Sequence, residues 1–400
     1  MEFNLNRFLL GLSLALDCVE SELLGVTTHH GKRVAYLSLR MAQALGLSPA
    51  QVFDSVAFSV LHDNGLSEES LGSREDGSQR LHRVEDMPAH CTIGERNVAK
   101  FPFQSDSRQV ILYHHENWDG SGFFGLNGSA IPPLAQIVGL ADYLDLKLNL
   151  GQPDPMARER LTALLAERTG SLCSPDMAEL FQAISTPTGF WLDLRDIHVG
   201  AALDRNMPVM TVEASWEQVL DISRVFSRII DSKSRFTQRH TSGLEEKTAI
   251  MADFYAVDPE TRVQLRIAAS LHDVGKLAIP NSILDKPGRL DDAERRKITE
   301  HTYYTRLCLE PIPGFQQITE WASNHHEKLT GTGYPLGLGP QHLDRWSRLL
   351  TVLDIYQALT EERPYRQSLS HSVTMGILER HVAAGELDPQ PVADVARAFA

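Results

Sequence analysis

The chain has 400 residues, of which 42% are hydrophobic and 22% charged, and these values are typical of globular rather than disordered proteins. Its length allows two ordinary domains, each with a hydrophobic core of its own. The net charge of −14 argues against a protein that wraps nucleic-acid polymers, because such proteins need clustered lysine and arginine. A small anionic substrate is not excluded, since a bound metal ion reverses the local sign of the charge.

The beginning of the chain shows no pattern typical of export. Residues 8–16 are an apolar run, but Glu2 precedes it, Asp17 interrupts it and no small-residue cleavage site follows. No run approaches the roughly 18 apolar residues that a membrane span needs. The four cysteines lie far apart without a CxxC pair, which favours reduced thiols. We therefore expect a cytoplasmic protein that does not associate with membranes.

Hydrophobic spacing predicts helices in both halves of the chain. Leu37, Met41 and Leu45 recur at every fourth residue in the first half, and Val263 and Ile267 have the same spacing in the second. Strand-like alternation is scarce. The predicted fold class is therefore all-α.

Helix-breaking residues gather between the two halves. Pro187, Gly189 and Pro208 interrupt the helical pattern, and a new amphipathic helix is predicted at 216–230. The predicted organisation has three parts: an N-terminal domain at 1–190, a linker at 191–215 and a C-terminal domain at 216–400.

One series of histidine and aspartate residues occurs twice, in the same order. The first copy consists of His30, His62, Asp63, His90, His114, His115 and Asp142. The second copy consists of His240, His272, Asp273, His301, His325, His326 and Asp354. From one histidine or histidine pair to the next, and on to the last aspartate, the gaps are 32, 28, 24 and 28 residues in the first copy and 32, 29, 24 and 29 in the second. Chance does not repeat seven residues in this way, so the chain is a tandem duplication of one helical bundle. Such gaps suggest one ligand position per helix.

The repeated residue types point to metal binding. Neutral imidazoles and carboxylates are ligands for manganese, iron and other borderline divalent ions. Five histidines and two aspartates exceed the need of one ion, and they suit two ions bridged by a carboxylate such as Asp273. Two metals about 3.5–4 Å apart are the arrangement used to hydrolyse phosphoesters. The pattern therefore predicts phosphoester hydrolysis at a dinuclear centre.

Three segments of the second half resemble the HD-GYP family, a branch of the HD phosphohydrolases. They are HDVGK at 272–276, HHEKLTGTGYP at 325–335 and LDIYQALTEERPYR at 353–366. The resemblance is strong over 220–390 and weaker over 10–185. It implies two tandem HD-type helical bundles and a di- or trinuclear iron or manganese centre. It also implies hydrolysis of a cyclic dinucleotide, principally cyclic di-GMP, to a linear dinucleotide and in many members to mononucleotides.

The resemblance assigns roles to the residues of the second copy. All seven of its histidines and aspartates would be metal ligands, and Asp273 and Lys276 would be catalytic. Lys276 would hold a phosphate oxygen, a role that suits an ammonium group. Arg363 and Arg366 match positions that contact the nucleotide phosphates, and Tyr334 would shape the mouth of the site.

The chain departs from the family pattern at two places in this half. Trinuclear members carry a glutamate four residues before the first histidine ligand, and this chain has Phe236 there. Because phenylalanine cannot ligate, we expect two divalent ions, iron or manganese. Thr330 stands where many members have aspartate, and the sequence leaves open what this changes.

The first copy keeps all seven ligand types but loses the phosphate-binding groups. The matched positions are Leu66 for Lys276, Phe123 for Tyr334, Gly151 and Asp154 for Arg363 and Arg366, and Val26 for Phe236. We interpret this half as a catalytically weak or inactive domain that packs on or regulates the other half and keeps a second metal site. Its Val26 predicts that a third metal is absent here too. In the alternative interpretation its histidines serve only to pack the core.

Three functions compete. The first is a cyclic-dinucleotide phosphodiesterase, for which cyclic di-GMP and the mixed cyclic GMP–AMP dinucleotide are both open as substrates. The second is a non-catalytic scaffold that senses a nucleotide or recruits partners. The third is another HD phosphohydrolase, acting on nucleoside phosphates or guanosine tetraphosphate. The phosphate-binding residues of the second copy favour the enzyme. The sequence leaves open the native metal, homo-oligomer formation, signalling-protein partners and the input signal.

Overall fold

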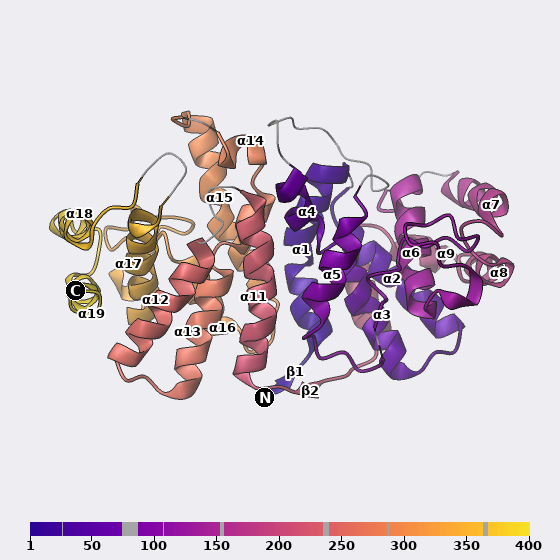
Figure 1. Cartoon of the computed structure of the whole chain (residues 1–400), viewed down its shortest axis with the longest axis horizontal. Coiled ribbons are helices and arrows are strands. Elements are labelled where there is room, and N and C mark those ends of the chain that lie inside the picture. The colour runs from indigo at the N-terminus through magenta and orange to yellow at the C-terminus, as the bar shows by residue number, and fades with distance from the viewer. Residues whose placement is uncertain are drawn as a thin grey trace. The chain divides into compact units, whose positions relative to one another are not determined.

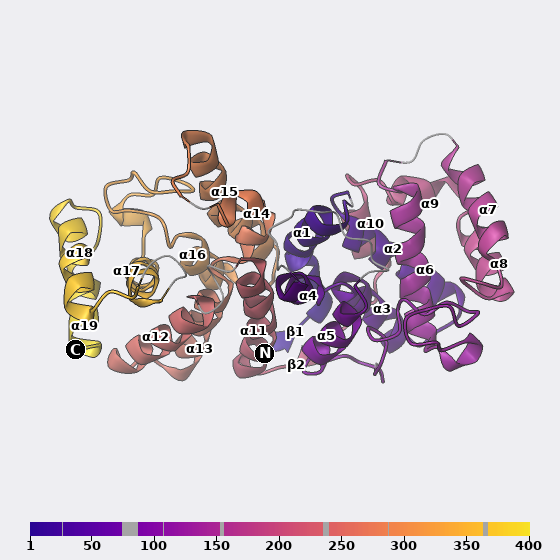
Figure 2. The same ribbon diagram turned by 45° about the horizontal axis from the view of Figure 1, so that its top comes forward.

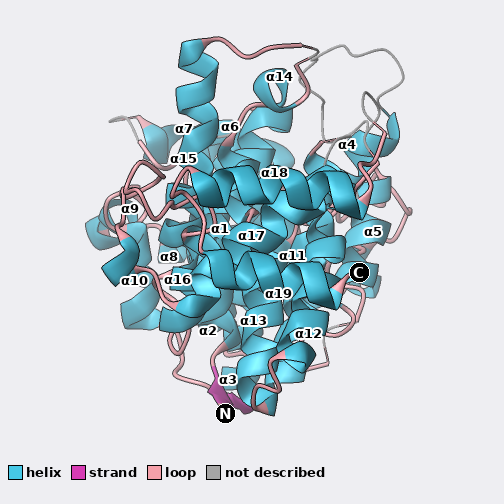
Figure 3. Ribbon diagram, turned by 90° about the vertical axis from the view of Figure 1, so that its left-hand side faces the viewer, coloured by secondary structure: helices cyan, strands magenta, loops and turns pink. Residues whose placement is uncertain are grey.

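The computed structural model describes residues 1–25, 27–73, 87–106, 108–152, 156–234, 240–286, 288–362 and 367–400. These residues form two compact units, Glu2–Glu213 and Met1 together with Ala214–Ala400. Both units are built from helices (Figures 1 and 3), as the all-α prediction requires. None of the described helices combines the length and the apolar character needed to cross a bilayer.

The first unit contains ten α-helices among its described residues and a two-stranded ribbon. Its helices are α1 (Leu5–Leu24), α2 (His30–Ala44), α3 (Pro49–Leu61), α4 (Leu66–Ser73), α5 (Ala89–Val98), α6 (Pro133–Leu148), α7 (Ala157–Arg168), α8 (Pro175–Ile184), α9 (Thr188–Asp193) and α10 (Val199–Asn206), with a 3₁₀ turn η2 (Gly128–Ala130). The antiparallel ribbon pairs β1 (Glu2–Phe3) with β2 (Val212–Glu213). The segment 191–215, which we expected as a linker, contains α10 and β2, and α10 packs on α2 inside this unit.

The second unit repeats the same series of core helices. Its elements are α11 (Trp216–Lys233), α12 (His240–Phe254), α13 (Pro259–Leu271), η3 (Val274–Ala278), α14 (Asn281–Leu284), α15 (Asp292–Leu309), α16 (Gln316–Ser323), η4 (Pro340–His342), α17 (Arg345–Thr360), α18 (His371–Ala383) and α19 (Pro389–Ala398). The predicted helix at 216–230 is present and extends to Lys233. Helix α13 packs on α11, α12 and α16 (Figure 2), with the side chains of Val263, Ile267 and Leu271 buried.

Local sequence explains where α3 and α13 begin, at a fixed distance before the repeated His-Asp pairs. Ser48 and Asp258 accept hydrogen bonds from the first turns of the two helices, and a proline follows each at the first helical position. Each helix then runs for 13 residues, to Leu61 in one unit and to Leu271 in the other. The pair lies directly after the helix, where the backbone turns and both side chains face inward. The caps thus fix the position of the most chemically important residues.

Candidate metal centres

The C-terminal residues predicted as ligands come together from five different elements. His240 begins α12, the His272-Asp273 pair follows α13, His301 lies on α15, the His325-His326 pair follows α16, and Asp354 lies on α17. Six of the seven side chains are buried, and His326 keeps 27% of its side chain exposed. Buried ligand side chains with one partly exposed histidine are suited to an ion that must also contact a substrate.

Asp273 stands between two groups of histidines. Its Oδ1 lies 3.4 Å from Nε2 of His301 and 3.7 Å from Nε2 of His325. Its Oδ2 lies 3.1 Å from Nε2 of His272 and 3.9 Å from Nε2 of His240. Oδ1 therefore faces His301 and His325, and Oδ2 faces His272 and His240. This is the geometry expected of a carboxylate that bridges two ions.

Asp354 completes the group around His240. Its Oδ1 is 3.0 Å from Nε2 of His240 and 3.9 Å from Nε2 of His272. Its Oδ2 is 3.9 Å from Nδ1 of His326. The carboxylate of Asp354 thus faces His240 and His272 and also lies near the partly exposed His326.

The histidines are held with one ring nitrogen committed to the backbone. The Nδ1–H groups of His272, His301 and His325 donate to carbonyl oxygens three residues earlier, at 2.8, 2.7 and 2.6 Å. This fixes the tautomer and leaves Nε2 free as a ligand atom. Nε2 of His272 and Oδ1 of Asp273 are buried without any hydrogen-bond partner. Since buried polar atoms are rarely unpaired, these residues fit a bound cation.

The charge states beside Oδ1 of Asp273 agree with metal binding. Burial lowers the pKa of His301 to about 3 and that of His325 well below its ordinary value, so both imidazoles are neutral. Burial alone would raise the pKa of Asp273, but His272 and Lys276 outweigh it and hold the pKa well below the ordinary range. Neutral imidazoles beside an ionised carboxylate are the forms that ligate. At His240 burial lowers the pKa, but Asp354 and Glu361 outweigh it and raise the value to about 9, so a metal ion there would displace a proton.

The residues predicted to handle the substrate lie beside this set where the structure describes them. Nζ of Lys276 is 2.5 Å from Oδ2 of Asp273. The ring of Tyr334 lies 4.9 Å from that of His326, centroid to centroid. Arg363, Arg366 and Phe236 lie outside the described residues.

One carboxylate holds the loop that carries Tyr334. Glu327 is buried and accepts backbone hydrogen bonds from Leu336, Gly337 and Leu338 at 2.7, 3.1 and 2.9 Å. Glu116 has the matching role in the first unit, where it accepts from Phe124 and Leu126. The sequence analysis did not identify either glutamate, although each directly follows a His-His pair.

Glu361 is another residue that the sequence analysis missed. It lies 3.5 Å from Nδ1 of His240, on the side of the ring away from Asp354. It follows Asp354 by seven residues, or about two helical turns, so both residues lie on the same face of α17 and its end. A carboxylate on the outer nitrogen of a ligating histidine orients the ring and raises its basicity.

The N-terminal residues form a cluster with the same arrangement. Oδ1 of Asp63 is 3.3 Å from Nε2 of His90 and 3.6 Å from Nε2 of His114. Its Oδ2 is 3.6 Å from Nε2 of His62. Oδ1 of Asp142 lies 3.1 Å from Nε2 of His30. His62, His90 and His114 also donate their Nδ1–H groups to carbonyl oxygens three residues earlier.

The surroundings of the N-terminal cluster differ from those of the C-terminal one. Leu66 is fully buried and begins α4, so the position that matches Lys276 supplies no cation to Asp63. The ring of Phe123 lies 5.4 Å from that of His115 and supplies no hydroxyl. The lysine and the tyrosine of the C-terminal site are thus missing at both of these positions, and Asp154 lies outside the described residues.

Two additional side chains enter the N-terminal cluster. Glu20 groups with His62 and Asp63, and Cys91 groups with histidines at the other end. Burial raises the pKa of the Glu20 carboxyl to about 8. Burial also raises the pKa of the Cys91 thiol, but His114 and His90 outweigh it and bring the value to about 7. Val26, the position expected to decide the number of metals, lies outside the described residues.

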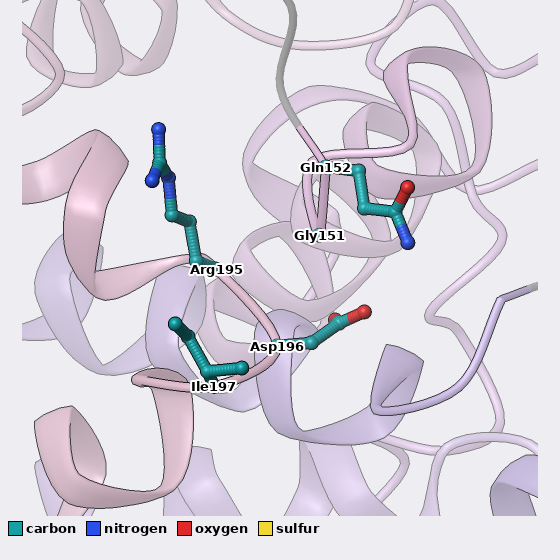
Figure 4. Close-up of a pocket in the computed structure, with 5 residues that line it drawn as sticks. All are labelled: Gly151, Gln152, Arg195, Asp196 and Ile197. Carbon is teal, nitrogen blue, oxygen red and sulfur yellow. The ribbon is translucent and has the colours of Figure 1, made fainter.

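A pocket opens in the first unit at the position aligned with Arg363. It has a volume of about 420 Å³ and is lined by Gly151, Gln152, Arg195, Asp196 and Ile197 (Figure 4). Asp196 is held there by the guanidinium of Arg33 at 2.6 Å. A Cβ on Gly151 would lie 2.5 Å from that carboxylate and 2.6 Å from Arg33. A larger residue in place of Gly151 would therefore have to displace the ion pair between Arg33 and Asp196.

Comparison with known proteins places this geometry in a family. The model of the HD domain family matches the chain twice, at residues 18–166 and 224–390. The chain is 30% identical to the 3'3'-cGAMP-specific phosphodiesterase 1 of Vibrio cholerae over 97% of its length and 90% of that protein. It is 30% identical to a cyclic di-GMP phosphodiesterase of Pseudomonas aeruginosa over 51% of its length and 49% of that protein.

A solved structure has the same fold over the whole chain. It is the crystal structure of a cyclic GMP-AMP specific phosphodiesterase of Vibrio cholerae, with a TM-score of 0.71, 24% identity and coverage of 100% of this chain and 98% of that one. The prediction of two tandem HD-type bundles is confirmed. The chain belongs to the HD-domain family, and within it to the HD-GYP branch.

Proposed function

We propose that this protein is a metal-dependent phosphodiesterase that hydrolyses a cyclic dinucleotide to the linear dinucleotide, and onward to mononucleotides. The observation that carries the proposal is the position of Asp273, with one oxygen toward each histidine group and Lys276 at 2.5 Å. Such a site brings together a place for two cations and a fixed ammonium group. The scaffold alternative is not favoured, because a relative matched over nearly its whole length is named as a phosphodiesterase.

The ligands in this proposal are the seven histidines and aspartates of the second copy, and the ions are two divalent cations, iron or manganese. When bound, such ions stabilise charge on phosphate oxygens and lower the pKa of a water molecule. The buried Nε2 of His272 and Oδ1 of Asp273, which lack hydrogen-bond partners, support this assignment.

The chain's own groups then act on the substrate. Lys276 would hold a phosphate oxygen beside Asp273, with Arg363 and Arg366 as further phosphate contacts. Tyr334 would border the mouth of the site next to the partly exposed His326. Glu361 would keep the ring of His240 in its ligating orientation.

We further propose that the mixed cyclic GMP–AMP dinucleotide is the preferred substrate. The relative that matches the chain almost from end to end is named as specific for 3'3'-cGAMP, whereas the cyclic di-GMP relative matches about half of it. The N-terminal domain in this proposal is inactive, because Leu66 and Gly151 put no cation at the positions that match Lys276 and Arg363, and it packs on or regulates the C-terminal domain.

The experiment is a comparison of initial rates with both substrates. The whole chain is loaded with manganese or iron, its metal content is measured, and hydrolysis is followed by chromatography. We expect cleavage of both dinucleotides, faster for cyclic GMP–AMP, and none by the Asp273→Asn variant prepared in the same way. If the metal-loaded chain cleaves neither substrate, the proposed function is wrong.

A further inference from the structure

The first side chain of interest is Glu20, which lies on α1. Its side chain is buried, with 3% of the residue exposed, and its Oε2 has no hydrogen-bond partner. Oε2 lies 4.0 Å from Nε2 of His30. Together with His62 and Asp63, Glu20 forms a group whose ligand atoms all lie within 4.8 Å of one another. A buried carboxylate that faces two histidines, with one oxygen that makes no hydrogen bond, fits the role of a metal ligand.

The C-terminal copy has no carboxylate at the corresponding place. Asp17 accepts a hydrogen bond from the backbone of Gly31, the residue after the first histidine. Asp231 accepts one from Thr241, the residue after His240, and is therefore its counterpart. Three residues after Asp17 stands Glu20, and three residues after Asp231 stands a serine. The additional carboxylate thus belongs to the N-terminal copy.

The second side chain is Cys91, which directly follows His90 on α5. It is fully buried, and its Sγ lies 3.5 Å from Nε2 of His90, the nitrogen left free by the backbone hydrogen bond of Nδ1. Cys91 groups with His90, His114 and His115 within the same 4.8 Å limit. The residue after His301 in the other copy is Thr302, whose hydroxyl donates to the carbonyl of Thr299. A thiol ligand is therefore also particular to the N-terminal copy.

Several buried polar atoms of this cluster have no hydrogen-bond partner. They are Nε2 of His62, His114 and His115, Oδ1 of Asp63 and Oε2 of Glu20. Histidines that served only to pack the core would be expected to have both ring nitrogens satisfied. Ligand atoms that face one another without hydrogen bonds instead fit a cation between them.

We propose that the N-terminal domain holds a metal centre of its own, in which Glu20 and Cys91 add a carboxylate and a thiolate to the seven repeated ligands. A thiolate beside imidazoles favours a softer borderline ion such as Zn²⁺ at the Cys91 end, in contrast to the nitrogen and oxygen donors of the C-terminal centre. Leu66 and Gly151 occupy the positions of Lys276 and Arg363 and bind no phosphate there. This centre therefore stabilises the fold and does not act on substrate.

Cobalt substitution tests the thiolate. Bound to a thiolate, Co²⁺ gives a charge-transfer absorption band in the near ultraviolet, and bound to nitrogen and oxygen alone it does not. The whole chain is stripped with a chelator and reconstituted with Co²⁺. We expect the band in the wild type and in Cys173→Ser, a control at another buried cysteine of the same unit that is not part of the cluster. We expect its loss in Cys91→Thr, which installs the residue of the other copy.

Metal stoichiometry tests the carboxylate. We expect the metal content of Glu20→Ser and of the nearly isosteric Glu20→Gln to fall by about one ion per chain, measured by mass spectrometry of the elements after dialysis against a weak chelator. Circular dichroism and the thermal midpoint with a chelator present show whether each variant is folded. If Glu20→Gln is folded and keeps the wild-type metal content, Glu20 is not a ligand.

The remaining outcomes are also decisive. A wild-type chain without a thiolate band, or a Cys91→Thr variant that keeps it, overturns the Cys91 assignment. These readouts do not depend on hydrolysis, so they separate this proposal from the proposed function. A chain that shows the band yet cleaves no cyclic dinucleotide keeps the N-terminal centre and loses the phosphodiesterase.

Discussion

The two halves of the molecule carry the same ligand frame in different surroundings. In the C-terminal half Lys276 contacts Asp273, and Tyr334 lies against His326. In the N-terminal half the matching places are a buried leucine and a phenylalanine, and a third is a glycine that lies against the ion pair of Arg33 and Asp196. The difference teaches that the residues suited to hold metal can persist in a half that lacks the residues suited to hold phosphate, because the two sets occupy different positions.

The pKa values of matched histidines also differ between the two clusters. Burial dominates at His301 and lowers its pKa to about 3. Burial also lowers the pKa of His90, but Asp63 and Cys91 outweigh it and raise the value to about 11. The imidazoles beside Oδ1 of Asp273 are therefore neutral, whereas those of His90 and His114 beside Oδ1 of Asp63 are charged. Metal binding in the N-terminal cluster would displace protons.

The largest effect outside the metal ligands is expected from Lys276→Ala. Removal of a cation that holds a phosphate oxygen should lower kcat/KM by about 10²–10³-fold, with the metal content unchanged. Lys286→Ala is the matched control, because its partner is Glu294 and it lies outside the site. Steady-state kinetics on a cyclic dinucleotide check this. A decrease in kcat/KM of less than about threefold would mean that Lys276 does not account for the functional difference between the two copies.

A smaller effect is expected from Glu361→Gln. Loss of the carboxylate beside Nδ1 of His240 should weaken metal binding about 10–100-fold while leaving the rate at saturating metal nearly unchanged. The measurement is activity as a function of free manganese concentration. Unchanged dependence on manganese would show that Glu361 does not support the C-terminal ligands.

Metal should also stabilise the fold. At a free concentration about 100 times Kd, one bound ion adds about 2.7 kcal/mol to the free energy of unfolding. Thermal unfolding with and without a chelator measures this. In Asp273→Asn part of the stabilisation should persist, because the N-terminal cluster is intact. Complete loss of the metal effect in that variant would place all bound metal in the C-terminal half.

The smallest effect is expected from Phe123→Tyr. This change restores the tyrosine of the C-terminal copy to the N-terminal one, but Leu66 and Gly151 still leave it without phosphate contacts. In the Asp273→Asn background we expect no gain in hydrolysis above the detection limit. Recovery of activity would show that the missing hydroxyl, and not the missing cations, had silenced this half.

The sequence predicted the repeated parts of the structure well, since they depend on local spacing. The recurrence of His-Asp and His-His pairs predicted that seven residues of each half converge, and the structure brings them together. The four-residue spacing of Val263, Ile267 and Leu271 predicted a buried helical face.

The residues that the sequence analysis missed enter the clusters from outside that frame. Glu20 precedes His30 by ten residues rather than four, and only the packing of α1 directs it inward. Cys91 was interpreted as an ordinary reduced thiol, because nothing in its spacing showed that its sulfur would face His90. The helix α10 inside the expected linker was missed because Pro187 and Pro208 dominate the pattern there.

The central claim, that only the C-terminal frame catalyses, is tested most directly by the matched pair His272→Asn and His62→Asn. Asparagine keeps a donor near the Nδ1–H position, where each histidine bonds a backbone carbonyl, and removes the Nε2 ligand atom. The measurement is hydrolysis of cyclic GMP–AMP at saturating substrate and metal. We predict that His272→Asn loses at least about 10³-fold in rate and that His62→Asn stays within about threefold of the wild type. Equal loss in both variants would contradict the division between the two halves.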